Sequence, residues 1–174
     1  MKADLEKIVS QYKFCFKCAG KLKWKENKLL ICQNCGSKNY LNAAPVNAAI
    51  LVNNKSQVLL VERKFDPKKG FWDLPSGFVD FNENAEESTT REIKEELNVE
   101  IRDLKYFSSE YDLYTYDGVT FPTLGIIFTG SVGNQKIQVS DDVSGFKFFD
   151  KKEIPFDRIA FEGLQDALRR YIKK

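Results

Sequence analysis

The stretch that decides the fold is Gly77–Val99, which reads GFVDFNENAEESTTREIKEELNV. Its pattern predicts a helix from about residue 84 to residue 97, in which Glu92, Glu95 and Glu96 stand at positions i, i+3 and i+4. Residues at this spacing share one helix face, and like charges held that closely repel one another. The three carboxylates therefore indicate a cation beside them, and oxygen ligands suit magnesium. A solvated acidic helix is the alternative that these three glutamates alone leave open.

The full stretch decides against the solvated helix, because it resembles the Nudix box, G-x5-E-x7-R-E-U-x-E-E-x-G-U with U aliphatic. The residues that match it are Gly77, Glu83, Arg91, Glu92, Ile93, Glu95, Glu96 and Val99. Asn98 stands where the family has its last glycine, and Ser76 replaces a glycine often found before the box. Asparagine is the next best residue for a left-handed turn after a helix, so we expect the turn at Asn98 to be kept.

The resemblance implies an α+β fold, an α/β/α sandwich around a mixed sheet, over residues 42–174. An N-terminal helix and a small four-cysteine zinc ribbon are expected before it, in residues 1–41. It also implies hydrolysis of a diphosphate linkage between a nucleoside and another group. In that reaction Mg2+ (or Mn2+) neutralises phosphate charge and lowers the pKa of the attacking water.

The box also carries over the roles of single residues. The expected magnesium ligands are the Gly77 carbonyl and the carboxylates of Glu92, Glu95 and Glu96, and the same three glutamates are the expected catalytic residues. Glu83 and Arg91 are expected to be structural partners.

Which carboxylate deprotonates the water stays open at this stage. Glu92 is one candidate, and a later loop carboxylate, Asp141 or Asp142, is the other. Arg63, Lys68 and Lys69 precede the box in a loop, where contact with substrate phosphates and simple solvation are equally open.

All four cysteines lie near the N-terminus as Cys15-x2-Cys18 and Cys32-x2-Cys35, separated by thirteen residues. Two such pairs across a hairpin-length spacer are typical of a closed, tetrahedral zinc site, whereas free or redox-active cysteines are the alternative. A ribbon of about 30 residues is too small to fold by burial alone, so we expect Zn2+ to supply its folding free energy.

The ribbon is strongly basic. Residues 11–40 hold seven lysines and one acid, which leaves 20 basic and 24 acidic residues in the rest of the chain. These lysines, together with Phe14, Phe16, Trp24 and Tyr40, suit a nucleic-acid surface. A solvated lysine face with packed aromatics is the interpretation that we favour.

The remaining pattern predicts mixed strands and helices. The expected strands are residues 46–52, 57–62, 106–116, 123–130 and 145–149. A final amphipathic helix is expected near residues 161–172, with Leu164, Ala167, Leu168 and Tyr171 on one side. Residues 72–75 and 141–149 look like the strands that flank the box in the family.

Composition limits the chemistry and the location. The chain has 174 residues and no histidine, which excludes Ser-His and Cys-His catalysis and histidine metal ligands. Charges interrupt the apolar positions of the N-terminus, and no apolar run approaches the length of a membrane span. We therefore expect a cytoplasmic protein without a membrane partner, and a homodimer stays open.

A four-cysteine ribbon before the box resembles NADH pyrophosphatases and related Nudix proteins, although their downstream signature Ser-Gln-Pro-Trp-Pro-Phe-Pro is replaced here by residues 111–116 and 120–124. The resemblance favours a nucleoside diphosphate derivative, such as ADP-ribose or NADH, as the substrate. The aromatic residues that could stack on a second ring are Phe71, Tyr114, Tyr116 and Phe121. The alternatives are a triphosphate or oxidised-nucleotide hydrolase, an RNA-end hydrolase that uses the basic ribbon, and a ligand-binding regulator; such a regulator would be expected to lose a box glutamate.

Overall fold

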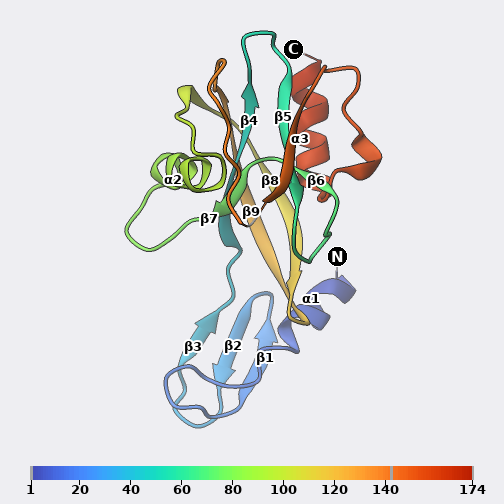
Figure 1. The fold of residues 1–174 in the computed structure, drawn as a ribbon. Coiled ribbons are helices and arrows are strands. Elements are labelled where there is room, and N and C mark those ends of the chain that lie inside the picture. The colour runs from blue at the N-terminus through green and yellow to red at the C-terminus, as the bar shows by residue number, and fades with distance from the viewer. Residues whose placement is uncertain (1, 142, 174) are drawn as a thin grey trace.

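The computed structural model describes residues 2–141 and 143–173, which form a small three-stranded sheet followed by a larger seven-stranded one. Figure 1 shows the small sheet beneath the larger one, with a short N-terminal helix beside it. The predicted boundary between residues 41 and 42 falls in the connection between the two sheets. No helix in the described part of the chain is long and apolar enough to cross a membrane.

The small sheet carries the cysteines. Helix α1 (Lys2–Val9) precedes an antiparallel sheet of β1 (Leu22–Glu26), β2 (Leu29–Cys32) and β3 (Lys38–Tyr40). The turn between β1 and β2 contains Asn27 in the left-handed region, with φ of 44°.

The larger sheet is mixed, as expected. Its strands are β4 (Ala44–Val52), β5 (Val58–Arg63), β6 (Trp72–Asp73), β7 (Ser76–Phe78), β8 (Arg102–Tyr116), β9 (Val119–Ser131) and β10 (Val143–Phe149). The strand order is β10-β5-β4-β9-β8, with β6 paired to β5 and β7 paired to β4. β4 and β9 run parallel, whereas the other pairs are antiparallel.

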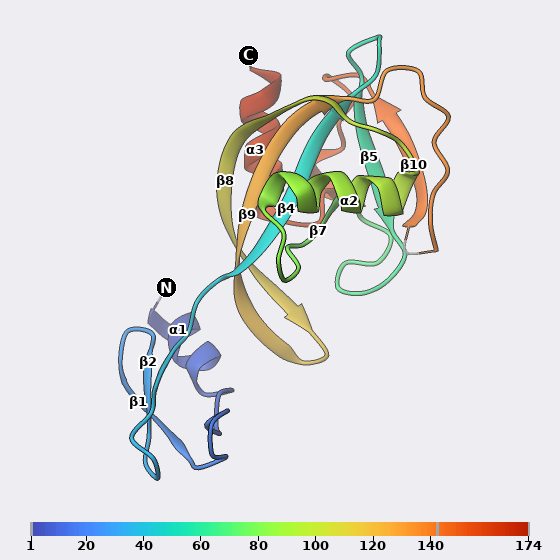
Figure 2. The same cartoon turned by 90° about the vertical axis from the view of Figure 1, so that its left-hand side faces the viewer.

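Helices α2 (Ala85–Leu97) and α3 (Glu162–Ile172) cover opposite faces of this sheet, and a 3-10 turn (Phe156–Arg158) precedes α3. Figure 2 shows α2 in front of the strands and α3 behind them. Because side chains alternate along a strand, β4 supplies both cores: Ala48 and Ile50 pack with α3, and Ala49 and Leu51 pack with α2. Burial on both faces explains the unbroken apolar run in this strand.

Strands β8 and β9 form a long hairpin, and each begins four residues earlier than the sequence predicts. Their turn is Asp117-Gly118, where φ is 48° and 76°, the backbone that a tight hairpin requires. The residues added at the two strand starts, 102–105 and 119–122, are exposed or half-buried, so they carry little of the apolar alternation on which the prediction relied. The hairpin extends from the larger sheet to α1 (Figure 1).

Candidate active site and metal centre

Helix α2 is fixed at both ends by its own sequence. The Asn84 side chain accepts a hydrogen bond from the Glu87 main chain, and the Glu87 carboxylate accepts one from the Asn84 main chain. This capping box satisfies amide groups that the first helical turn leaves without partners. At the other end Asn98 has φ of 52° and ψ of 38°, so the left-handed turn is kept without the glycine. The predicted helix is confirmed.

Glu83 and Arg91 brace the loop that leads into α2. Arg91 donates from Nη2 to Glu83 Oε1 at 2.7 Å and from Nε to Glu83 Oε2 at 3.0 Å. The Asp80 main-chain N–H also donates to Glu83. The Arg91 hydrogen bonds, followed by the one from Asp80, lower the pKa of Glu83 to about 2. This two-point pairing is the geometry that arginine and a carboxylate prefer.

Glu92 lies directly against strand β7. A Cβ atom at Gly77 would collide with the Glu92 carboxyl group, so this position of the box has to be glycine. Burial raises the pKa of Glu92, although Arg91 Nη1, at 2.9 Å from Glu92 Oε1, acts in the opposite direction. The absence of a side chain at Gly77 thus creates the cradle for this carboxylate.

The other two glutamates differ in surroundings. The Glu95 side chain is 61% exposed, against 17% for Glu92, and its Oε2 accepts from Arg91 Nη1 at 3.1 Å. Arg91 therefore lies between Glu92 and Glu95, and its positive charge reduces the repulsion between the two carboxylates. Glu96, in contrast, lines a polar cavity together with Glu62 and Ser76. Carboxylate oxygens suit a hard cation such as magnesium, and the space beside Gly77 admits the Glu92 carboxylate. Among the described residues, however, the oxygen atoms of Glu92, Glu95 and Glu96 do not all lie within 4.8 Å of one another.

The loop that follows β9 lies alongside the end of α2. Ser140 N donates to Glu96 O at 2.9 Å, and Lys64 Nζ donates to the Asp141 carbonyl at 2.7 Å. Asp141 is therefore close in the chain to a residue held against the box helix, and its side chain is exposed. Asp142, the other loop candidate, lies outside the described residues.

Two cavities flank the start of the box. One, of about 220 Å3, lies between the sheet and α3 and is lined by Gly77, Phe78, Asp112 and Phe161, among others. The second, of about 300 Å3, is more polar and is lined by Glu62, Lys64, Asp66 and Glu96, among others. Arg63, Ser76 and Tyr114 line both.

Arg63 is held by a buried carboxylate. Its Nη1 donates to Asp73 Oδ2 at 2.7 Å, its Nε donates to the Pro67 carbonyl at 2.7 Å, and its guanidinium lies 5.1 Å from the centre of the Phe161 ring. Burial raises the pKa of Asp73 to about 6, although Arg63 acts in the opposite direction. Arg63 thus forms part of the wall between the cavities, with its orientation set by Asp73.

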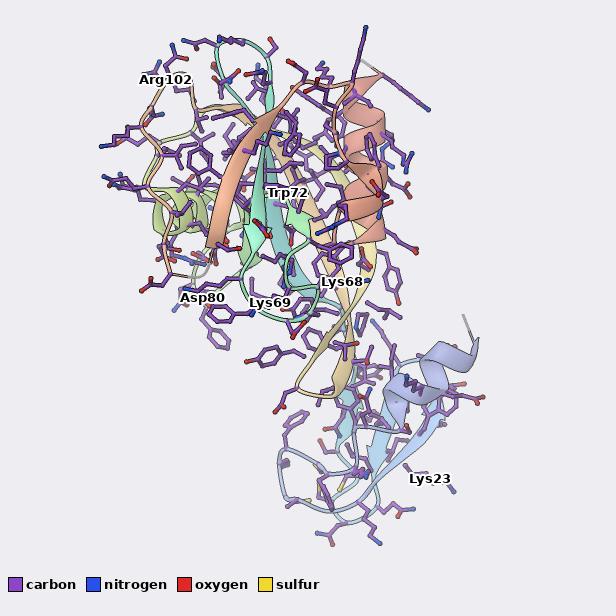
Figure 3. The ribbon with its side chains drawn as sticks, turned by 45° about the vertical axis from the view of Figure 1, so that its right-hand side comes forward. Lys23, Lys68, Lys69, Trp72, Asp80 and Arg102 are labelled. Carbon is purple, nitrogen blue, oxygen red and sulfur yellow. The ribbon has the colours of Figure 1, made fainter. Side chains whose placement is uncertain are left out.

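The two lysines of the loop before the box lie at its surface. Both are exposed, and Lys68 Nζ is 5.4 Å from the centre of the Phe71 ring. Figure 3 places Lys68 and Lys69 at the same end of the larger domain as Asp80. Their contact with phosphates stays a prediction.

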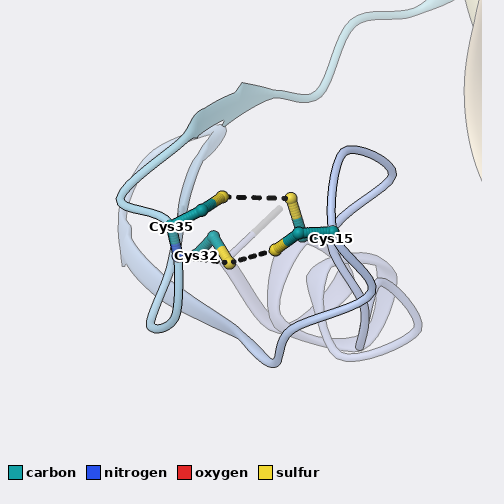
Figure 4. Close-up of side chains that lie close together, drawn as sticks. Cys15, Cys32 and Cys35 are labelled. Carbon is teal, nitrogen blue, oxygen red and sulfur yellow. Dashed lines mark hydrogen bonds between the residues drawn. The ribbon is translucent and has the colours of Figure 1, made fainter.

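The four cysteines converge at one end of the ribbon. Among the described residues they are the one group of three or more thiol or carboxylate side chains whose ligand atoms all lie within 4.8 Å of one another. The Sγ atoms of Cys15 and Cys35 are 4.0 Å apart, and those of Cys18 and Cys32 are 3.6 Å apart (Figure 4). A tetrahedron of zinc–sulfur bonds of about 2.3 Å requires sulfur separations of about 3.8 Å. The arrangement therefore suggests zinc.

The backbone around the cysteines also fits a metal site. The main-chain N–H of Lys17 points to Cys15 Sγ, and that of Cys35 points to Cys32 Sγ, at 3.4 and 3.5 Å. A Cβ atom at Gly20 would lie 2.7 Å from Asn34 Cβ and 3.1 Å from Cys32 Sγ. N–H groups of this kind stabilise thiolates that bind a metal.

Several residues of the site were not identified from the sequence. Asp112 lines the first cavity and accepts a hydrogen bond from Gly163 N at 2.9 Å, near the start of α3. Phe161 forms another wall, and Asp73 orients Arg63. Asp73 had one local signal, a charged residue inside the short apolar segment 72–75, whereas nothing near Asp112 or Phe161 indicates their place.

Comparison with known proteins identifies the larger domain. The family model described as the NUDIX domain matches residues 43–171. An ADP-ribose pyrophosphatase of Methanocaldococcus jannaschii is 32% identical over 112 residues, which cover 64% of this chain and 64% of that protein.

A protein named NAD-capped RNA hydrolase NudC, from Haemophilus influenzae, is 29% identical over 110 residues. The matched part covers 62% of this chain and 41% of that relative, so this chain matches less than half of its length. Among solved structures, a NUDIX hydrolase from Nitrosomonas europaea has a TM-score of 0.70 and 26% identity, and the match covers 92% of this chain and 90% of that one.

Proposed function

The chain belongs to the Nudix family, and from that premise we propose that it is a magnesium-dependent pyrophosphohydrolase. Its substrate is a nucleoside diphosphate joined to a second group, of the ADP-ribose or NADH type. The names of relatives from Methanocaldococcus jannaschii and Haemophilus influenzae are in keeping with such a substrate.

The observation that carries this proposal is the pair of cavities on either side of Ser76. The polar one is lined by Glu96, and the other has walls formed by Phe78, Tyr114 and Phe161. Ligand pockets for whole drug-sized molecules measure about 300–1,000 Å3, so the aromatic cavity of about 220 Å3 suits one ring system. A nucleoside diphosphate derivative has a group at each end of its diphosphate and can place one in each of two cavities that share a wall, whereas a nucleoside triphosphate has one ring system, for the aromatic cavity, and no second group.

The side chains divide the work as follows. Glu92, Glu95 and Glu96, with the Gly77 carbonyl, hold magnesium, which when bound neutralises phosphate charge and lowers the pKa of a water molecule. Glu92 accepts the proton of the attacking water; Asp141 and Asp142 are the alternatives on the neighbouring loop. Glu83 and Arg91 hold the box loop in place, and Arg63 faces the substrate between the cavities.

The cysteine site is proposed to hold one structural Zn2+ through Cys15, Cys18, Cys32 and Cys35. Four protein thiolates complete a tetrahedral site and leave no position for substrate. Reduced thiols of this kind are maintained in a reducing compartment, which supports the expected cytoplasmic location.

A substrate panel tests the proposal. Catalytic efficiencies for ADP-ribose, NADH, diadenosine polyphosphates and 8-oxo-dGTP are compared at one magnesium concentration. We expect ADP-ribose or NADH to lead. A tenfold lead of the triphosphate, equivalent to about 1.4 kcal/mol in transition-state stabilisation, would overturn the assignment.

A second candidate function is supported by the surface of the ribbon. Its seven lysines are all exposed, and among the described residues none of them forms an ion pair. They are Lys13, Lys17, Lys21, Lys23, Lys25, Lys28 and Lys38. Uncompensated lysines beside the exposed rings of Phe14, Phe16 and Tyr40 suit a single-stranded RNA, whose end would enter the active site.

Salt dependence separates the two candidates. If the ribbon binds RNA, catalytic efficiency on a dinucleotide-capped RNA should fall steeply with salt, whereas efficiency on the free dinucleotide should change little. The variant Lys21→Glu/Lys23→Glu should weaken only the RNA reaction, with Lys152→Glu, on the larger domain, as the control. Equal salt slopes for both substrates would exclude this function.

A further inference from the structure

One side chain of the ribbon pairs with the main chain of the larger domain at the hairpin. Gln11 Nε2 donates to the Thr120 carbonyl at 2.8 Å, and the Thr120 main-chain N–H donates to Gln11 Oε1 at 2.8 Å. Among the residues whose side chains the structure describes, one other hydrogen bond links residues 5–41 to residues 42–173, that of Lys28 Nζ to Asn42 Oδ1 at 3.1 Å, next to the connection between the two parts. The amide of Gln11 therefore pairs with both main-chain groups of Thr120, as a neighbouring strand would.

Thr120 belongs to the part of the hairpin that forms the aromatic wall. It lies opposite Thr115 in the register, and the two hydroxyl groups are 2.9 Å apart. The next pair in the register is Tyr114 and Phe121, with ring centres 5.6 Å apart. Tyr114 lines both cavities. A shift of the strand at Thr120 is thus transmitted across one residue pair to the wall that faces the substrate.

The ribbon in turn fixes the position of Gln11. Gln11 Nε2 also donates to the Ile8 carbonyl at 3.2 Å, and Ile8 is buried. Two residues after Gln11, the Lys13 carbonyl accepts from Leu22 N at 2.9 Å, which ties this segment to β1. Cys15 follows and contributes its sulfur to the four-cysteine cluster. Gln11 is therefore held by the same short segment that the four thiolates organise.

We propose that Gln11 is a positioning residue through which the metal-held ribbon fixes the aromatic wall of the substrate cavity. The proposal rests on the proposed function for its kinetic consequence, but its structural consequence is independent of any activity. On this proposal the ribbon contributes to substrate binding by holding one wall of the cavity in position. Loss of the metal then makes the hairpin more mobile, because the ribbon segment that holds Gln11 in position is no longer ordered.

Hydrogen exchange measures the structural consequence directly. In Gln11→Met, which keeps the length of the side chain and removes both hydrogen bonds to Thr120 as well as the one to Ile8, protection of the Thr120 amide should fall by about tenfold. Gln33→Met is the matched control, because Gln33 is exposed on the same ribbon and no side-chain hydrogen bond of it is present among the described residues. Removal of zinc from the wild-type protein with a chelator should reproduce the effect of Gln11→Met. Unchanged protection of residues 114–121 in both experiments would overturn the proposal.

Kinetics on the best substrate of the panel give the second readout. Gln11→Met should raise KM about threefold to tenfold with kcat largely retained, because the wall contacts the bound ring and not the reacting phosphorus. Gln11→Glu, which keeps the acceptor for Thr120 N–H and loses the donor, should fall between wild type and Gln11→Met. Equal KM values in all three would overturn the proposal. If no substrate is hydrolysed at all, the proposed function fails and the exchange result still decides the role of Gln11.

Discussion

The ribbon and the larger domain achieve a folded state by different physical means. The larger domain buries two apolar clusters, one on each face of its sheet, which include Ile50, Leu60 and Leu168 on one side and Leu59, Ile93 and Leu97 on the other. In the described part of residues 2–41 the buried apolar side chains are Ile8, Val9, Cys15, Leu30 and Cys32. Two of these five are cysteines of the cluster.

This difference means that the two parts should respond differently to the same disturbance. A module of this size buries too little apolar surface to offset its conformational entropy, so we expect metal binding and folding of the ribbon to be one event. The two tryptophans allow each part to be followed alone: Trp24 lies in β1, and Trp72 packs against Phe149 with ring centres 5.1 Å apart. Trp24→Phe and Trp72→Phe give single-tryptophan proteins for the larger domain and the ribbon, respectively.

The largest expected effect is that of zinc removal. Binding free energies of structural zinc sites are about 10–16 kcal/mol, so Cys32→Ser or chelation should unfold the ribbon and leave the larger domain folded. Trp24 fluorescence should shift to that of an exposed indole, while Trp72 fluorescence stays unchanged. Elemental analysis should give one zinc per chain in untreated protein. Absence of zinc, or a Cys15–Cys18 disulfide in freshly purified protein, would contradict this interpretation.

The next effect concerns the box glutamates. Glu95→Gln and Glu96→Gln should each lower turnover about a thousandfold, equivalent to about 4 kcal/mol, because each removes a magnesium ligand. Thermal stability should change little, because the removal of one like charge from the group offsets, in Glu95→Gln, the loss of an exposed ion pair with Arg91. Glu86→Gln, on the same helix and exposed, is the control. An unchanged rate at limiting magnesium would show that these residues only lie at the surface.

Truncation of a core side chain tests whether the larger domain can be destabilised without an effect on the ribbon. Leu60 is fully buried in the cluster beneath α3, so Leu60→Ala should lower the free energy of unfolding by about 2–5 kcal/mol. Denaturant unfolding followed through Trp72 measures the loss, and the transition followed through Trp24 should keep its midpoint. A parallel shift of both transitions would mean that the two parts unfold as one unit.

The smallest effect is a change in pH dependence. The pKa of Glu83 is lowered to about 2 in the folded protein, chiefly by the hydrogen bonds from Arg91, against about 4.3 in an unfolded chain. A lowered carboxyl pKa stabilises the fold above pH 4.3, and this contribution disappears as the pH falls toward 2. The stability difference between wild type and Glu83→Gln, followed through Trp72, should therefore be constant above pH 5 and shrink below pH 4. A difference independent of pH would exclude the ion pair.

Much of the site could be predicted because its signals are local. The spacing of Glu92, Glu95 and Glu96 places them on one helix turn whatever the rest of the fold does, and Asn84 and Asn98 cap that helix from adjacent positions. Paired cysteines two residues apart likewise form a knuckle by local geometry. The burial of both faces of β4 also follows from its sequence, because a strand with one face in solvent would alternate apolar and polar residues, whereas residues 48–52 are all apolar.

Tertiary structure alone decided the surroundings of these residues. Gln11 and Thr120 are 109 positions apart, and Asp112 meets Gly163 across 51 positions, so no local pattern links them. The local arrangement of the box glutamates on one helix turn, and of each cysteine pair in a knuckle, follows from the sequence itself, because residues two to four positions apart are held near one another by the local backbone geometry. The aromatic wall, the orientation of Arg63 by Asp73 and the link from the ribbon to the hairpin depend on which distant strands pair, and burial of the whole chain selects that pairing.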